Sequence, residues 1–142
     1  MQLVHFSNAD KKVTLPNRKK LKVFLIALLQ REGARKLNSL SYVFCCDNYL
    51  LDINQKFLHH DYYTDIITFD LSSDIKTLTG EIYISIDRIK ENAKSLEISF
   101  DHELHRVIIH GALHLCGFKD KTKQQKLIMR KKEEENLKIY FE

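Results

Sequence analysis

Residues 110–120 read HGALHLCGFKD, and the rest of the chain is organised around this stretch. The mostly apolar run before it, residues 104–109, predicts a long helix. His110 and His114 point the same way on that helix, because residues four apart are offset by only about 40°. Gly117 stands where a C-cap glycine would end the helix, and Asp120 follows in a loop. Two imidazoles, one carboxylate and one open position form the ligand set of a catalytic zinc site, not of a closed structural one.

The histidine pair has a second interpretation, because two histidines at this spacing are often only packed or half-exposed side chains. The glycine stop and the acidic residue after it favour a metal site. In zincin peptidases a glutamate follows the first histidine and acts as the general base, but Gly111 stands at that position here. Peptidase chemistry of that type therefore lacks its base.

Composition predicts a single globular domain spanning residues 1–142. The chain is 44% hydrophobic with one proline and four glycines, so it can bury a core and has little material for disordered linkers. The longest apolar run, residues 23–29, is far shorter than the roughly 20 residues of a membrane span. The first residues show no signal peptide, and three cysteines, an odd number, fit a reducing compartment. We therefore expect a cytoplasmic protein without a membrane partner, whose cysteines are small buried hydrophobes.

The net charge of +4 is unevenly distributed along the chain. Lysine and arginine dominate residues 1–36 and 119–132, whereas aspartate and glutamate dominate residues 37–100. Basic regions gain affinity for phosphate backbones by releasing counterions, which favours a polyanionic partner. A solvated surface with uneven charge is the alternative interpretation.

Hydrophobic periodicity predicts alternating strands and helices. The expected strands are residues 2–7, 40–46, 66–69 and 80–86, and the expected helices are residues 17–32, 49–60, 87–96, 100–116 and 123–139. We expect Asp47 and Asn48 to cap the second helix and Ser99 the fourth. The two middle strands should form an antiparallel hairpin. The fold class is then α/β (α+β), a small mixed β-sheet covered by helices, with the metal site on a central helix and the loop after it.

The same periodicity predicts which side chains are buried in three of the helices. The expected positions are Leu21, Phe24, Leu25, Leu28 and Leu29 in the first helix, Leu50, Leu51, Ile53, Phe57 and Leu58 in the second, and Leu127, Ile128 and Leu137 in the last.

Three ordered blocks of the sequence resemble the YbeY family of metal-dependent endoribonucleases, which act in bacterial ribosomal RNA maturation. HGALHLCGFKD at residues 110–120 is similar to the family's H-G-x-L-H-L-x-G-[YF]-D-H. LDINQKF at residues 51–57, then Asp61 and TDIITF at residues 64–69, resemble LN-x-x-[YF]-R-x-x-D-x-P-T-D-V-L-S-F. GEIYIS at residues 80–85 is similar to GDI-x-IS.

The resemblance implies cleavage of single-stranded RNA, maturation of the 3′ end of small-subunit ribosomal RNA, and ribosome quality control. The ribosomal small subunit and its RNA are the implied partners. The metal ligands would be His110, His114 and Asp120, where the aspartate replaces the family's third histidine. Zinc is the first choice, and Mn²⁺ or Fe²⁺ also suit two imidazoles and a carboxylate.

The family arginine of the middle block falls on Leu58, so if that arginine contacts phosphate, this chain must use another cation. Lys56, Arg106 and Lys119 are the candidates for that role. Arg106 lies one turn before His110 on the same helical face, although a salt bridge to Glu103 is an equal alternative. We expect Arg106 to act in catalysis together with the two histidine ligands, and Lys56 and Lys119 to bind substrate.

Two points stay open at the level of sequence. The general base is not identified, and Asp65 or His59 would reach the site only if the middle block folds over it. The run His59-His60-Asp61 is compatible with a metal site, but such loop clusters are more often ordinary surface. The rival functions are a non-catalytic RNA- or ribosome-binding assembly factor with a structural metal, and a small-molecule metal hydrolase or iron oxygenase.

Overall fold

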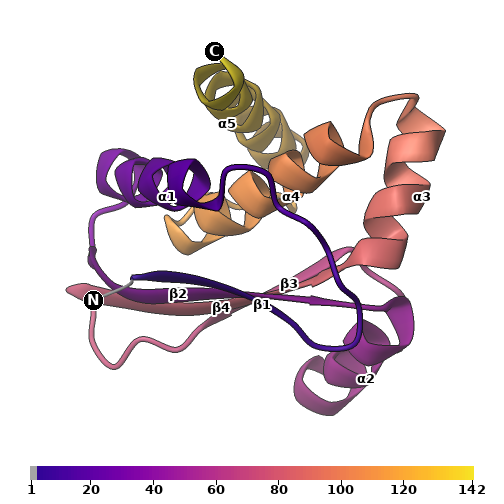
Figure 1. Ribbon diagram of the computed structural model, residues 1–142. Helices are drawn as coiled ribbons and strands as arrows, with labels where there is room; N and C mark the ends of the chain where they lie inside the picture. Colours follow the sequence, from indigo (N-terminus) through magenta and orange to yellow (C-terminus); the bar gives the residue numbers. More distant parts are fainter. Residues whose placement is uncertain (1–2) are drawn as a thin grey trace.

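The computed structural model describes residues 3–142 and has four strands and five helices in these residues (Figure 1). The strands are β1 (Val4–Asn8), β2 (Lys36–Cys45), β3 (Ile66–Asp70) and β4 (Thr77–Ser85). The helices are α1 (Arg18–Glu32), α2 (Asp47–Leu58), α3 (Ile86–Leu96), α4 (Phe100–Leu115) and α5 (Lys123–Phe141). Each element agrees with a predicted one, although β2 and β4 begin several residues earlier than expected. Gln2 of the first predicted strand lies outside the described residues.

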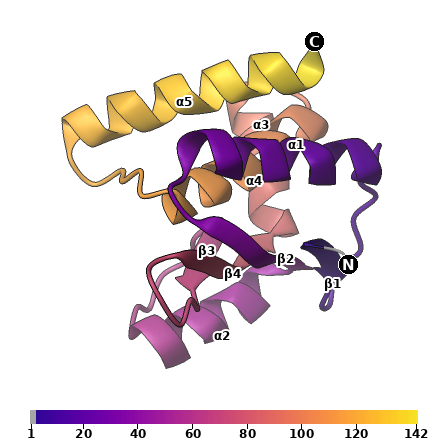
Figure 2. The same ribbon diagram turned by 90° about the vertical axis from the view of Figure 1, so that its left-hand side faces the viewer.

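The sheet is mixed and has the strand order β1-β2-β4-β3. β1 pairs with β2 and β2 with β4 in parallel, whereas β3 and β4 form the predicted antiparallel hairpin. Helices α1 and α4 cover one face of the sheet, and α2 lies against the other face (Figure 1). Helix α5 packs on α1 and α4 as an outer layer (Figure 2). The predicted α/β architecture is therefore confirmed.

Helix α4 lies between the sheet and α5, and most of its side chains are buried. Gly111 lies close against the sheet, since a Cβ added there would lie 2.9 Å from the Cδ1 atoms of Ile66 and Ile82. A side chain at this position would displace packed core residues. Gly111, at the position where a zincin carries its glutamate, is thus part of the contact between helix and sheet. His110 and His114 on the same helix are only half-buried.

Both ends of α4 are capped as the sequence predicts. The Ser99 hydroxyl accepts a hydrogen bond from the His102 amide at 3.0 Å. Gly117 has φ of +102°, and the Phe118 amide donates to the Leu113 carbonyl at 3.1 Å. These are the features of a Schellman motif, which turns the chain back towards the helix it has just left. The loop that carries Asp120 therefore returns along the face of α4 that bears the histidines.

The burial expected in α2 is largely wrong. Among its apolar residues only Leu50 is buried, whereas Phe57 is 67% and Leu58 39% exposed. Within residues 3–142, α2 is the one helix on its face of the sheet, so only a narrow side of it is covered (Figure 1). Its N-cap also differs from the prediction, because the Cys46 thiol and not Asp47 or Asn48 accepts from the Tyr49 amide.

The burial expected in α5 is wrong for two of its three positions. Leu127 and Ile128 are 63% and 45% exposed, and only Leu137 is buried as predicted. The buried row consists of Met129, Glu133, Asn136, Leu137 and Tyr140. Two of these residues are polar, so hydrophobic periodicity alone points to the wrong side of the helix. In α1 the predicted leucines are buried, and Phe24 is half-buried against Tyr140.

The three cysteines are free thiols. Cys45 is buried, and burial raises the pKa of its thiol to about 12. Cys46 and Cys116 are only half-buried, so the expectation of three buried thiols is met by one. Within residues 3–142, no helix combines the length and the hydropathy that a membrane span requires.

Candidate metal centre

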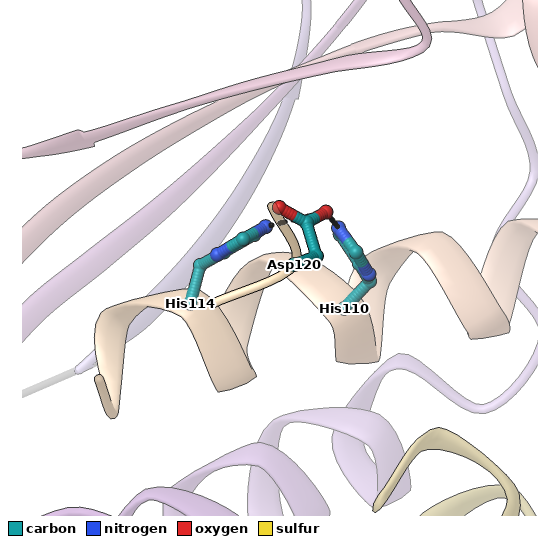
Figure 3. Close-up of side chains that lie close together, drawn as sticks. All are labelled: His110, His114 and Asp120. Atoms are coloured by element: carbon teal, nitrogen blue, oxygen red, sulfur yellow. Dashed lines mark ion pairs between the residues drawn. The ribbon is translucent and has the colours of Figure 1, made fainter. Parts of the chain in front are cut away.

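Three side chains converge beside the C-terminal half of α4 (Figure 3). The Nε2 atoms of His110 and His114 lie 3.3 Å and 3.4 Å from the same oxygen, Oδ2 of Asp120. The two imidazole rings are nearly perpendicular, at 86°, with centroids 4.5 Å apart. Among the residues that the structure describes, these three form the one group of histidine, cysteine and acidic side chains arranged to hold a metal. The loop His59-His60-Asp61 forms no such group.

The spacing of the three donor atoms fits a tetrahedral metal ion. Two ligands that each lie about 2.05 Å from a zinc ion at the tetrahedral angle are separated by about 3.3 Å. The two measured nitrogen–oxygen distances agree with that separation. Two nitrogens and one oxygen leave a fourth position for solvent or substrate, which is the donor set of an open site. The residues present therefore fit a mononuclear metal centre.

Hydrogen bonds at the far side of each imidazole hold the ligands in orientation. His114 Nδ1 donates to the Phe118 carbonyl at 2.9 Å, which leaves the lone pair of Nε2 facing the triad. His110 Nδ1 lies 2.6 Å from Oε2 of Glu133 on α5. A carboxylate behind a metal-binding histidine fixes its tautomer and raises its basicity. Burial would raise the pKa of Glu133, but the contacts with His110 and Arg106 hold it below its usual value.

Arg106 joins this carboxylate to a second buried acid. Its Nε and Nη2 atoms donate to the two carboxylate oxygens of Glu103 at 2.7 Å and 2.8 Å, and Nη1 donates to Glu133 at 3.1 Å. The Glu103 side chain is fully buried and that of Glu133 is 8% exposed. The salt bridge between Arg106 and Glu103, which the sequence indicates as the alternative role of Arg106, is therefore present. The second ion pair of Arg106, with Glu133, ties α4 to α5 behind His110.

The triad opens onto a cleft of about 620 Å³. The cleft is lined by the end of α2, the loop of residues 59–65, strand β3 and the loop after α4. Asp65 is one of its lining residues, so the middle block does fold over the site. Burial raises the pKa of this carboxyl, and Arg106 and His110 partly offset that effect. Lys121 also lines the cleft.

Other residues expected at the site lie outside this cleft. Lys56 forms an exposed ion pair with Asp52 on α2, at 3.0 Å. Lys119 is exposed next to Asp120, and neither it nor His59 is among the cleft-lining residues that the structure describes. Sequence reasoning missed Glu133, because the dense charge of α5 looked like a solvated surface. It also missed Lys121, although this residue directly follows Asp120.

A glutamine at position 133 is expected to weaken metal binding by about 10- to 100-fold, because a neutral amide is a poorer partner for His110 Nδ1. Competition of the purified Glu133→Gln variant with a colorimetric zinc chelator measures this affinity. Glu134 is the next residue of α5 and is exposed, so Glu134→Gln serves as the matched control and should bind as the wild type. Equal affinity in both variants would contradict the orienting role of Glu133.

The fold and the site together define a class, an α/β protein with a candidate mononuclear metal centre open to a cleft. The family model described as Endoribonuclease YbeY matches residues 4–140. The chain therefore belongs to the Endoribonuclease YbeY family, and the resemblance seen in the three sequence blocks is confirmed.

Curated relatives and one solved structure agree with this assignment. The Endoribonuclease YbeY of Porphyromonas gingivalis is 48% identical over 88% of this chain and 83% of its own length. That of Cytophaga hutchinsonii is 44% identical over 97% of this chain and 96% of its own length. The solution structure of a Thermotoga maritima protein is similar, with a TM-score of 0.65 and 25% identity, over 97% of this chain and 89% of that one.

Proposed function

We propose that the protein is a metal-dependent endoribonuclease that cleaves single-stranded RNA in ribosomal RNA processing. The observation that carries the proposal is the convergence of His110, His114 and Asp120 at the mouth of a cleft, in a chain of this family. The finer parts of the proposal are maturation of the 3′ end of small-subunit ribosomal RNA, ribosome quality control, association with the small subunit and a cytoplasmic location.

His110 and His114, through Nε2, and Asp120, through its carboxylate, would hold the metal. Zinc is our first choice for this donor set, with Mn²⁺ and Fe²⁺ as alternatives. A metal held there would supply Lewis-acid chemistry, which would lower the pKa of a coordinated water towards neutrality and polarise a phosphoryl oxygen. Glu133 keeps the His110 ring in place, and the Phe118 carbonyl does the same for His114.

Asp65 is our choice for the group that accepts the proton of the attacking water. Among the described residues three carboxylates line the cleft, and two of them are already engaged. Asp70 is held by Arg35 at 2.7 Å, and Asp120 belongs to the triad. Asp65 is half-buried and has only longer contacts, from its Oδ2 to Asn92 Nδ2 at 3.4 Å and to Arg106 Nη2 at 4.0 Å.

The cations named from the sequence have different parts in this proposal. Arg106 either contacts phosphate directly or holds Glu133 in place, and experiment distinguishes these two alternatives. Lys121 lines the cleft and is a further candidate for phosphate contact. Lys56 and Lys119 are exposed, so they would bind RNA that extends beyond the cleft.

Removal of metal tests the proposal directly. The purified protein, analysed for bound metal, should cleave a labelled single-stranded RNA, lose this activity in a chelator and regain it with Zn²⁺. The same RNA annealed to its complement is the control and should be cut far more slowly. Salt-sensitive RNA binding without cleavage under any metal would instead support a non-catalytic assembly factor. Iron-dependent oxygen consumption with a small substrate would support the third alternative.

A further inference from the structure

Two aromatic rings line the same cleft as the metal triad. His60 and Tyr62 come from the loop between α2 and β3, and their rings stack at 20° with centroids 5.1 Å apart. The Tyr62 hydroxyl lies 3.0 Å from His60 Nδ1, which joins the rings as one unit. Tyr62 nevertheless remains 57% exposed. The stack therefore presents aromatic surface to a ligand instead of contributing it to the core.

The loop that carries these rings is held in one conformation by a buried side chain. Asn54 is 2% exposed, and its amide donates to the Tyr62 carbonyl at 3.0 Å. The backbone carbonyl of Asn54 also accepts a hydrogen bond from the backbone amide of His60, at 3.1 Å. Residue 59 enters the left-handed region, with φ of 57°, as the chain leaves α2. A ring that is already fixed loses little conformational entropy when a ligand stacks on it.

The charges of the cleft do not favour binding by phosphate contacts alone. Among the described residues that line it, Lys121 is the one lysine or arginine, against Asp65, Asp70 and Asp120. Asp70 is paired with Arg35, but in the absence of metal the remaining carboxylates leave little net attraction for a polyanion. A strand that enters the metal-free cleft needs a source of affinity other than charge. Stacking on aromatic rings supplies it for unpaired bases, because every base has a π-face.

We propose that the His60–Tyr62 stack is a base-binding platform, which takes an unpaired nucleobase of the RNA whose phosphate lies at the metal triad. The inference rests on the proposed function and deepens it, because it gives a physical reason for single-strand preference. A base within a duplex has both faces covered and its edge paired, so it is not free to stack on this pair. The platform reads the presence of an unpaired base more than its identity.

Binding of a short fluorescein-labelled single-stranded RNA, followed by anisotropy in a chelator, tests the platform without cleavage. Tyr62→Ala should raise the Kd about five- to tenfold, the low end of the stacking range because the His60 ring remains. Tyr62→Phe keeps the ring and loses the hydroxyl contact with His60, so it should bind more tightly than Tyr62→Ala. Tyr63→Ala is the matched control. It removes an exposed tyrosine of the same loop, one that contacts Asn48 and Arg88 and is not among the cleft-lining residues.

An RNA of the same length with abasic sites separates base contacts from backbone contacts. It should bind the wild type more weakly, and Tyr62→Ala should cause no further loss. In cleavage assays with metal, Tyr62→Ala should raise KM by the same factor and leave kcat nearly unchanged. Active enzyme with an unchanged Kd and KM in Tyr62→Ala would overturn the platform and leave the proposed function intact. Tyr62-dependent binding by a protein that never cleaves RNA would support the platform and overturn the nuclease.

Discussion

Replacing His114 by alanine should abolish metal binding and RNA cleavage together while the protein stays folded. The ring supplies one of three ligands, and the two that remain, His110 and Asp120, leave the metal weakly held. Loss of the metal removes several kcal/mol of transition-state stabilisation, so cleavage should fall by about a thousandfold, which corresponds to about 4 kcal/mol. Metal content of the purified variant and the rate of cleavage of a labelled single-stranded RNA measure the two effects.

The fold should tolerate this change, because the cap at the end of α4 is made by backbone groups. The variant loses one hydrogen bond, from His114 to the Phe118 carbonyl, which costs about 1 kcal/mol of unfolding free energy. Urea unfolding without metal measures that cost. Added Zn²⁺ at 100 times the wild-type Kd should stabilise the wild type by about 2.7 kcal/mol and leave the variant nearly unchanged.

His102→Ala is a matched control for this experiment. His102 is an exposed histidine of the same helix, its ring stacks on Phe141, and it is not part of the triad. It should keep metal binding and cleavage at the wild-type level. Full cleavage by a metal-free, folded His114→Ala protein would refute the metal centre as the source of activity.

The part of the site that the sequence predicts is the part encoded locally. Two histidines one turn apart, a glycine that ends the helix and an acid just beyond it lie within residues 110–120, and helix geometry alone brings them together. The strands and the capping serine of α4 follow from equally local patterns. Such features require no knowledge of which helix packs on which.

What the sequence does not reveal is decided by packing between distant segments. Glu133 lies 23 residues after His110 and contacts it because α5 folds back over α4. In sequence it stands within a run of charged residues that has the pattern of a solvated face. The burial predicted for the end of α2 is wrong for a related reason, since no second helix among the described residues covers that face of the sheet (Figure 1). The rings of His60 and Tyr62 face a cleft that exists only once β3 and α4 are adjacent.

The ion pairs of Arg106 lead to the second large expected effect, which concerns stability. The guanidinium makes two short hydrogen bonds to Glu103, which is fully buried, and one to Glu133. If Arg106 is removed, Glu103 keeps its position in the core without its cationic partner. An uncompensated buried charge costs about 3 to 5 kcal/mol. The arginine itself is 27% exposed, so the low end of that range applies.

Arg106→Met should therefore lower the free energy of unfolding by about 3 kcal/mol, measured by urea denaturation without metal. Arg130→Met, at an exposed position of α5, is the matched control and should change it by less than about 0.5 kcal/mol. The double variant Arg106→Met with Glu103→Gln should recover part of the loss, because the unpaired buried charge is gone. Zinc affinity should also fall in Arg106→Met, since Glu133 loses the partner that holds it against His110. Wild-type stability and zinc affinity in Arg106→Met, combined with a raised KM for RNA, would instead assign this arginine to direct contact with phosphate.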